Sequence, residues 1–346
     1  MSWVLVASIA VWLAVPPMLL VWSNRLGIPP ARPLAPLDRS PAASVVVFGR
    51  DPAGLVETVG DVLRSVRLGQ TEFLLVGIGR AAAMAAEELA SQEPRLRCLD
   101  HEPEGPHPEL RAAHRGGKAA REDEIVFVRA GTRLAPSALA RLLILRRERA
   151  VHLLSALPLH RRMDSIASLL MPLKPWLVHA LMPLGGRGGG PLRAAADTAL
   201  IAVSKSGWQD AGGHKAAFGP HDGIGLARAF RRRQLRTGIV DGAGLCWTRA
   251  PVGLEGCLEE LGPVLDAFGR QRAALVLVLA GQLLPFLLLA AAPDLPTTAA
   301  KLAFTGVAAV WIARLLLCFR RGDPVLSAFA QPVAATVLLL RVLARR

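Results

Sequence analysis

Uncharged apolar segments of membrane-spanning length lie at both ends of the chain and constrain its fold more than any other feature. Residues 1–23 and 273–293 contain no charged side chain, and residues 302–319 are almost as apolar. About 20 apolar residues are enough to cross a bilayer as a helix. We therefore predict a multi-pass membrane protein, with an N-terminal transmembrane helix over residues 1–23. We also predict a C-terminal membrane region over residues 271–346 with two to three hydrophobic helices. The number depends on whether residues 325–340 span the membrane or form a re-entrant segment.

A cleaved signal peptide is the alternative interpretation of residues 1–23. The segment lacks a basic leading region and a small-x-small cleavage site, which favours a membrane anchor. The first basic residues, Arg25, Arg32 and Arg39, follow the segment, so the positive-inside rule predicts that the next domain is cytoplasmic at the cell membrane. Residues 24–43 contain five prolines and are predicted to be a linker.

The charge balance favours anionic partners. The chain has 41 Lys and Arg against 27 Asp and Glu, a formal net charge of +14. Such an excess is typical of proteins that face an anionic lipid surface, nucleotide phosphates or nucleic acid. Aromatic residues make up only 5% of the chain, which leaves few platforms for stacking bases and argues against a nucleic-acid partner. No Cys-x-x-Cys pair is present among the four cysteines, which argues against a zinc cluster.

Between the membrane segments, short apolar runs alternate with segments of helical spacing. Such alternation indicates a mostly parallel, doubly wound α/β sheet, which we assign to residues 44–270. The predicted strands are residues 44–48, 73–76, 95–99, 124–128, 198–203 and 237–240, and the predicted helices are residues 55–68, 81–91, 110–121, 134–149 and 227–236.

Two segments interrupt this alternation. Residues 161–186 carry an apolar stripe broken by three prolines, and they form either helices in the membrane interface or a buried helical hairpin. Residues 185–190 are almost all glycine, but they lack the strand–turn–helix context and the Gly-Lys-Ser/Thr ending of a phosphate-binding loop, so we predict a plain loop.

The stretch from residue 194 to residue 249 contains the most site-like pattern. A predicted strand is followed by a turn-rich segment, residues 207–213, and then by His221 and Asp222 at the start of a basic helix. An acid at a helix start is often only a cap, and composition alone favours that interpretation.

The complete layout resembles that of membrane-bound family-2 glycosyltransferases with the GT-A fold, in particular the hopanoid-associated and ceramide-glucosyltransferase-like group. One membrane helix, an α/β domain, possible interfacial helices and a C-terminal membrane region follow one another in both. The resemblance covers nearly the whole chain in layout. It implies a GT-A-like doubly wound sheet, a nucleotide-sugar donor, and a lipid or polyprenyl-type acceptor at the membrane.

The family's donor motifs match the chain unevenly. After the first strand, Arg50 and Asp51 stand where the family has a Pro-x-Arg-Asn-Glu-like turn. After the fourth strand, Arg129 and Gly131 occupy the positions of an Asp-x-Asp motif. Arg249 is what is left of an Arg/Gln-x-x-Arg-Trp element. The resemblance therefore makes Arg50, Asp51, Arg129 and Arg249 the candidates for binding the donor.

In this family the Asp-x-Asp carboxylates hold a divalent metal, Mg²⁺ or Mn²⁺, on the donor pyrophosphate. Residues 75–80 and 126–132, where such acids would stand, contain none. We therefore assign no metal ligand and leave the use of a metal open. Either Arg129 replaces the metal as a fixed cation on the donor pyrophosphate, or the donor site has degenerated.

The acceptor motif is better preserved. In the family a Glu-Asp pair opens the basic helix, and its Asp is the general base that deprotonates the acceptor hydroxyl. Asp222 falls on that base, and His221 replaces the Glu. A positioned base contributes about 10²–10⁴-fold to the rate, and an adjacent imidazole is able to tune it.

Two functions follow from these patterns. The first is a membrane-associated glycosyltransferase that moves a sugar from a nucleotide-sugar donor to a membrane lipid or polyprenyl-type acceptor at the cytoplasmic face. The alternative is a non-catalytic glycosyltransferase-like scaffold or partner subunit in lipid or polysaccharide assembly. The missing carboxylates after the second and fourth strands favour the alternative, and Asp222 favours the enzyme.

Overall fold

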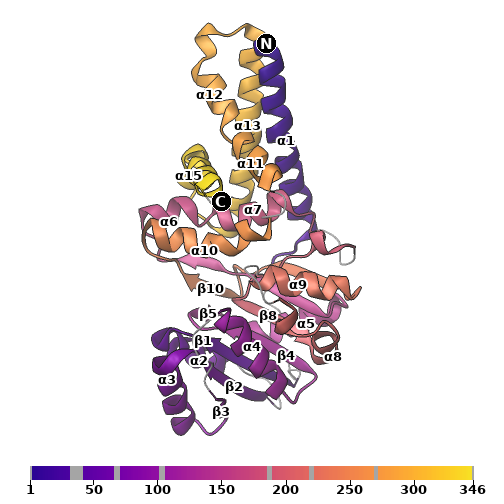
Figure 1. Ribbon diagram of the computed structural model, residues 1–346, viewed down its shortest axis with the longest axis vertical. Helices are drawn as coiled ribbons and strands as arrows, with labels where there is room; N and C mark the ends of the chain where they lie inside the picture. Colours follow the sequence, from indigo (N-terminus) through magenta and orange to yellow (C-terminus); the bar gives the residue numbers. More distant parts are fainter. Residues whose placement is uncertain are drawn as a thin grey trace. The chain divides into compact units, whose positions relative to one another are not determined.

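The computed structural model describes residues 2–31, 42–65, 71–100, 106–184, 189–217, 222–268 and 272–344. The chain divides into two compact units (Figure 1). We call the first the membrane unit, which comprises Met1–Gly27, Met163–Gly185 and Ala250–Arg346. The second, the sheet unit, comprises Ile28–Arg162 and Gly186–Arg249.

The sheet unit is built on a seven-stranded, mostly parallel sheet in the order β3-β2-β1-β4-β8-β6-β9. Strand β8 runs antiparallel to both of its neighbours, and the other pairs are parallel. The predicted α/β fold class is confirmed. The strands are β1 (Ala43–Gly49), β2 (Thr71–Gly77), β3 (Leu96–Cys98), β4 (Glu124–Arg129), β6 (Leu153–Leu157), β8 (Leu200–Ser204) and β9 (Thr237–Asp241).

Helices cover both faces of this sheet. Strand β1 is buried along its whole length, and its side chains alternate between two apolar cores, with Val45 and Val47 in one and Val46 and Phe48 in the other. Such continuous apolar strands are expected where a parallel sheet is covered on both faces. The first core takes in α2 (Pro52–Ser65), α3 (Gly79–Gln92) and α5 (Ala138–Glu148), and the second takes in α4 (Pro108–Ala119), α8 (Lys205–Asp210) and α9 (Asp222–Arg232).

A second, three-stranded sheet in the order β5-β10-β7 adjoins the end of β4. Residue Leu134, predicted to begin a helix, instead ends β5, and the helix starts at Ala138. Side chains alternate along β10, where Cys246 and Thr248 are buried. These strands were not predicted because each is too short to show a period. They are β5 (Thr132–Leu134), β7 (Leu159–Arg161) and β10 (Cys246–Arg249).

The prediction of a turn-rich segment at residues 207–213 is wrong for its first half, because residues 207–210 belong to helix α8. The Ser204 hydroxyl accepts a hydrogen bond from the Gly207 N–H at 3.3 Å and caps this helix. A Ser cap offsets the low helix propensity of glycine in a single short turn.

A histidine lies in the centre of the second core. His214, which begins the 3₁₀ helix η2 (His214–Ala217), is 2% exposed. Its Nδ1 accepts a hydrogen bond from Trp208 Nε1 at 3.1 Å, and its ring meets Phe127 edge-on at 4.4 Å. Burial, with His114 as a second cause, lowers the pKa of His214 to about 3. The imidazole is therefore neutral and serves as an acceptor for the indole.

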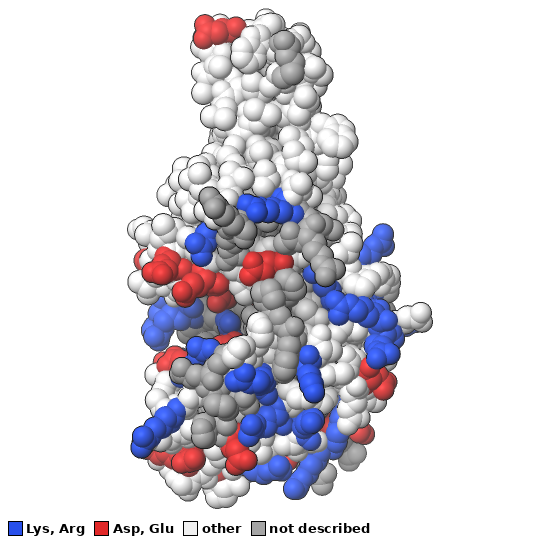
Figure 2. All heavy atoms as spheres, in the orientation of Figure 1, with Lys and Arg blue, Asp and Glu red and all other residues white. Residues whose placement is uncertain are grey.

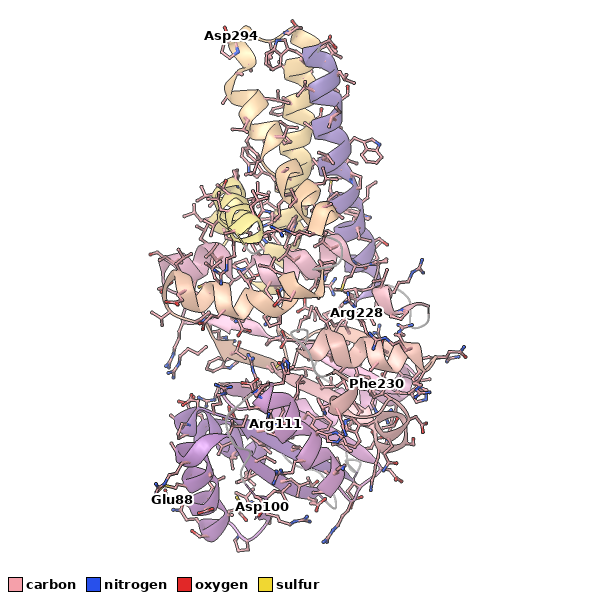
Figure 3. All side chains as sticks on the ribbon, viewed as in Figure 1. Glu88, Asp100, Arg111, Arg228, Phe230 and Asp294 are labelled. Carbon is pink, nitrogen blue, oxygen red and sulfur yellow. The ribbon has the colours of Figure 1, made fainter. Side chains whose placement is uncertain are left out.

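The membrane unit contains three helices that are long and apolar enough to cross a membrane: Trp3–Asn24, Arg272–Ala290 and Thr297–Arg321. On the face drawn in Figure 2, the upper part of these helices shows almost no charge apart from an acidic tip, where Figure 3 labels Asp294. They match the three longest predicted apolar segments. The elements are α1 (Trp3–Gly27), α11 (Arg272–Gly281), α12 (Leu284–Ala290) and α13 (Thr297–Arg321), followed by the shorter α14 (Leu326–Phe329) and α15 (Gln331–Ala344).

The described part of residues 161–186 begins with the last residue of β7 and contains two short helices, α6 (Ser165–Leu170) and α7 (Leu173–Leu181). Lys174 pairs with Glu260 of α10 (Gly253–Ala267) at 2.5 Å. The buried Asn24 side chain donates to the carbonyls of His179 and Met182, at 2.8 and 2.6 Å. An amide that satisfies the last carbonyls of a helix fixes the end of α7 against α1.

A buried arginine lies inside the membrane unit. Arg314, on α13, is 1% exposed, and its guanidinium donates to the Pro172 carbonyl at 2.7 Å and to Ser327 Oγ at 3.2 Å. Ser327 in turn donates to the Pro324 carbonyl at 2.7 Å. Ionisable groups in apolar surroundings are costly unless their donors are satisfied, so Arg314 joins α13 to the α6–α7 connection and to α14.

Replacing Arg314 by leucine is expected to destabilise the membrane unit, because the Pro172 carbonyl loses its donor in a dry environment. We expect the free energy of unfolding to fall by roughly 1–3 kcal/mol. This should lower the fraction of full-length protein that stays monodisperse in detergent after heating. The exposed Arg341 provides the control: Arg341→Leu should change stability by less than about 0.5 kcal/mol.

Lowering the pH should destabilise the sheet unit through His214. Its folded pKa of about 3 lies below the ordinary imidazole value of 6.5, so the unfolded chain takes up the proton first and acid favours unfolding. The contribution of the neutral His214 to the free energy of unfolding is fully present above pH 6.5. It falls by about 1.4 kcal/mol for each pH unit between pH 6.5 and about pH 3. His214→Gln keeps an acceptor for Trp208, and its thermal unfolding should depend less on pH than that of the wild type. His107→Asn, at an exposed site, should keep the wild-type dependence.

Candidate functional site

Most of the candidate donor residues lie at the carboxyl edge of the large sheet. Arg50 and Asp51 directly follow β1, and Arg129 ends β4, paired with Phe48 of β1. The pairing of β10 with β5 ends at Thr248 and Thr132, one residue before Arg249, and the Arg249 guanidinium lies 3.6 Å from Glu57 of α2. In open α/β sheets, ligands bind outside this edge. The structure therefore brings the backbones of the four predicted donor-binding residues to one region.

Asp51 has a structural role as well. Its Oδ1 accepts the Ala53 N–H at 3.1 Å, and its carbonyl accepts the Leu55 N–H at 2.9 Å, so Asp51 caps α2. Pro52 follows as the first helical residue, where its missing N–H costs nothing. Arg50 is exposed beside it.

The turn after β4 is shaped for glycine. Gly131 has φ +84°, and its N–H points at both Thr58 Oγ1 and the Gly54 carbonyl, at 3.0 and 3.1 Å. A side chain at Gly54 would place its Cβ 2.8 Å from the Gly131 nitrogen, so α2 packs directly on this turn. An aspartate at position 131 would be strained in this backbone conformation.

The residues at this edge do not fit a divalent metal. Arg129 and Gly131 supply no carboxylate, and the residues after β2 begin with Ile78. Within the described ranges, no three His, Cys, Asp or Glu side chains are grouped closely enough to hold an ion. Arginine and glycine stand at the positions where the family has its metal ligands.

Arg249 belongs to an ion-pair network with α2. Its guanidinium lies 3.6 Å from Glu57, whose other carboxylate oxygen lies 3.3 Å from Arg133. Arg133 also pairs with the buried Asp61, with its Nε 2.5 Å from Oδ2 and its Nη2 3.1 Å from Oδ1. Burial acts to raise the pKa of the Asp61 carboxyl, but hydrogen bonds from Arg133 and others outweigh it and hold that pKa below its ordinary value.

The outward side of the small sheet also gathers cations around an indole. The guanidinium carbons of Arg133 and Arg161 lie 5.3 and 5.2 Å from the centre of the Trp247 ring. Such cation–π contacts contribute about 0.5–1 kcal/mol each when exposed. On the opposite side of the sheet, Thr248 Oγ1 and the buried His160 Nδ1 are 3.0 Å apart. Sequence reasoning singled out Arg249 but gave no role in a site to Arg133 or Arg161.

The predicted base, Asp222, begins α9, a basic helix that includes Arg228 (Figure 3). Asp222 is its first residue, while His221 and the Asp222 side chain lie outside what the structure describes. The next residue, Gly223, is buried against the chain that enters β8. A Cβ at Gly223 would lie 2.6 Å from the Ala196 carbonyl oxygen, so only glycine fits there. This contact places the backbone of Asp222 beside residues 196–197.

Asp197, a carboxylate that sequence reasoning missed, lies beside this contact. It is 8% exposed, and its Oδ1 accepts the Ala199 N–H at 2.9 Å. The Ala199 carbonyl accepts the Arg129 N–H at 3.2 Å. A short turn of chain therefore lies between the end of β4 and the start of α9. Through this turn, the backbone that carries Arg129 is connected to the backbone at the start of α9, where Asp222 lies.

Comparison with solved structures supports this description of the fold. The chain is similar to the mannosyltransferase PcManGT from Pyrobaculum calidifontis, solved with GDP-Man and Mn²⁺, with a TM-score of 0.56 and 16% identity over 97% of this chain and 99% of that one. It is less similar to TarS from S. aureus, solved with UDP-GlcNAc, with a TM-score of 0.44 and 11% identity over 87% and 90% of the two chains. No family model and no curated protein sequence matches the chain. The first likeness shows that the chain has a GT-A-like glycosyltransferase fold.

Two arginine variants should separate the structural from the ligand-binding part of the ion-pair network. Arg133→Met deprives the buried Asp61 of its main partner and should destabilise the sheet unit by roughly 1–3 kcal/mol. Arg249→Met removes only an exposed pair and should cost less than about 1 kcal/mol. Thermal unfolding of the full chain in detergent measures both. Equal losses in the two variants would contradict this division.

Proposed function

We propose that the protein is a membrane-associated glycosyltransferase that moves a sugar from a nucleotide-sugar donor to a lipid or polyprenyl-type acceptor at the cytoplasmic face of the membrane. The observation that carries the proposal is the packing of Gly223 on the Ala196 carbonyl, which brings the start of α9, and with it Asp222, to the carboxyl edge of the sheet. A GT-A-like fold and three helices of membrane-spanning length support it.

In this mechanism, Asp222 accepts the proton of the acceptor hydroxyl, and the resulting oxygen nucleophile attacks the anomeric carbon of the donor sugar. The bond from that carbon to the nucleotide diphosphate breaks, with inversion of configuration. A carboxylate aligned for this transfer contributes about 10²–10⁴-fold to the rate. His221 precedes Asp222 in the chain and would adjust its basicity.

The leaving diphosphate needs positive charge. Arg129 ends β4, and Arg249 ends β10, which pairs with the strand β5 that follows β4 along the chain. Guanidinium groups bind diphosphate oxygens with charge-assisted, often bidentate hydrogen bonds. We assign this role to Arg129 and Arg249, with Arg50 as a further cation at the edge. A divalent ion has no carboxylate ligands of the expected kind here, so no step is assigned to one.

A second function has its own support. A non-catalytic glycosyltransferase-like scaffold or partner subunit in lipid or polysaccharide assembly would keep the fold without the donor carboxylates. The conformation of Gly131, with φ +84°, favours this alternative, because the backbone at the second Asp-x-Asp position disfavours the acid itself.

Calorimetry on the full chain in detergent tests the proposal. Titration with UDP- and GDP-sugars, with and without Mn²⁺, should give binding that does not require the ion. Asp222→Asn removes the base with almost no change in side-chain size and keeps an acceptor oxygen, so this variant should bind a nucleotide sugar normally and lose transfer to detergent-solubilised lipid by about 10²–10⁴-fold. Arg249→Met should weaken binding about tenfold. Absence of binding for every nucleotide sugar would favour the scaffold.

A further inference from the structure

The turn from Ala196 to Ala199 touches both halves of the candidate site. We propose that Asp197 is a positioning residue, which holds the end of β4 and the first turn of α9 in fixed relation to each other. The functional meaning of this role rests on the glycosyltransferase proposed above, whereas the positioning itself is a property of the fold. Nothing in the sequence pattern marked this residue.

The backbone of Asp197 is held from both sides by one hydroxyl. Ser155, in the middle of β6, donates from Oγ to the Asp197 carbonyl at 3.0 Å and accepts the Asp197 N–H at 2.8 Å. Ser155 is 0% exposed, so no water competes for these hydrogen bonds. The turn that leads into β8 is therefore attached to β6, which is one neighbour of β8 in the large sheet, while β4 is its other neighbour.

The Asp197 side chain closes the turn on the donor side. Its Oδ1 accepts the N–H of Ala199, two residues on, which is the geometry of an Asx turn. This orients the Ala199 carbonyl, which accepts the N–H of Arg129 at 3.2 Å. The Asp197 carboxylate thus acts on the backbone of Arg129 through one intervening residue.

The same turn supports the acceptor side. A Cβ at Gly223 would lie 2.6 Å from the Ala196 carbonyl oxygen and 3.2 Å from the Asp197 carbonyl carbon, so the backbones are in direct contact. Close backbone contacts without side chains leave little room for adjustment. Any shift of the turn is therefore transmitted to the first turn of α9, which Asp222 begins.

The hydrogen bond to Ala199 requires an oxygen acceptor but not a negative charge. An asparagine side chain supplies the same acceptor, whereas alanine leaves the buried Ala199 N–H without a partner. The pair Asp197→Asn and Asp197→Ala therefore separates the positioning role from a role of the charge.

Asp241 offers a matched control. It is 4% exposed, and its Oδ1 accepts the N–H of Ala243, two residues on, at 3.2 Å. It ends β9, the outermost strand beyond β6, so it has the same kind of turn at the same edge of the sheet.

Hydrogen–deuterium exchange of the full chain in detergent tests the positioning. Asp197→Ala should raise amide exchange about tenfold in the peptides covering residues 126–131 and 222–230, and Asp197→Asn should leave both at wild-type rates. Asp241→Ala should raise exchange around residues 241–245 alone. Unchanged exchange over residues 222–230 in Asp197→Ala would overturn the inference, as would an Asn variant that is as damaging as the Ala variant.

The same measurement with UDP or GDP added connects the turn to ligand binding. In the wild type and in Asp197→Asn, either nucleotide should protect both peptides, whereas in Asp197→Ala protection of residues 222–230 should be lost. Protection that persists there in the Ala variant would contradict the coupling. If neither nucleotide protects the wild type, the glycosyltransferase proposal fails, while the exchange results without nucleotide still decide the positioning role.

Discussion

The contact between Gly223 and the Ala196 carbonyl is the interaction on which the site depends. It allows α9 to begin at the carboxyl edge of the sheet instead of stopping short of it, because any side chain at Gly223 would meet backbone atoms at 2.6 Å. On the other side of the same turn, the Ala199 carbonyl accepts a hydrogen bond from the N–H of Arg129, the last residue of β4. Two hydrogen bonds between the Ser155 hydroxyl and the Asp197 backbone hold this junction to the sheet. The relative position of the candidate donor and acceptor residues is thus set by backbone contacts.

Charge at the donor edge is arranged differently from what a metal-dependent site requires. The carboxylates that the structure places near this edge already have partners: Asp51 caps α2, Glu57 lies between Arg133 and Arg249, and Asp61 is bound by Arg133. Each of them therefore serves the fold or balances an arginine. The positive charge that a transferring diphosphate needs would come from guanidinium groups, which need no ion as an intermediary.

Long periodic segments could be predicted from the sequence, and short ones could not. Strands β1, β2 and β4 and the three longest apolar helices follow from continuous apolar runs. The three-residue strands β5 and β7 exist only because β10 pairs with both, which is a tertiary effect. Helix α8 depends on a Ser cap that outweighs its glycine. Asp222, Arg129 and Arg249 came from resemblance to a family, whereas Asp197 had no motif to reveal it.

This difference has a physical reason. Motifs mark side chains that touch a ligand, because chemistry limits which residue types can do so, whereas a residue that works through the backbone is limited only by hydrogen-bonding capacity. Asp197 fills its role by accepting one N–H, which several residue types do. A GT-A-like fold can therefore keep its geometry while the side chains at the donor edge change, and fold alone does not establish function. Under the proposed function, the Asp197 turn is what connects nucleotide binding at Arg129 to the residue that begins α9.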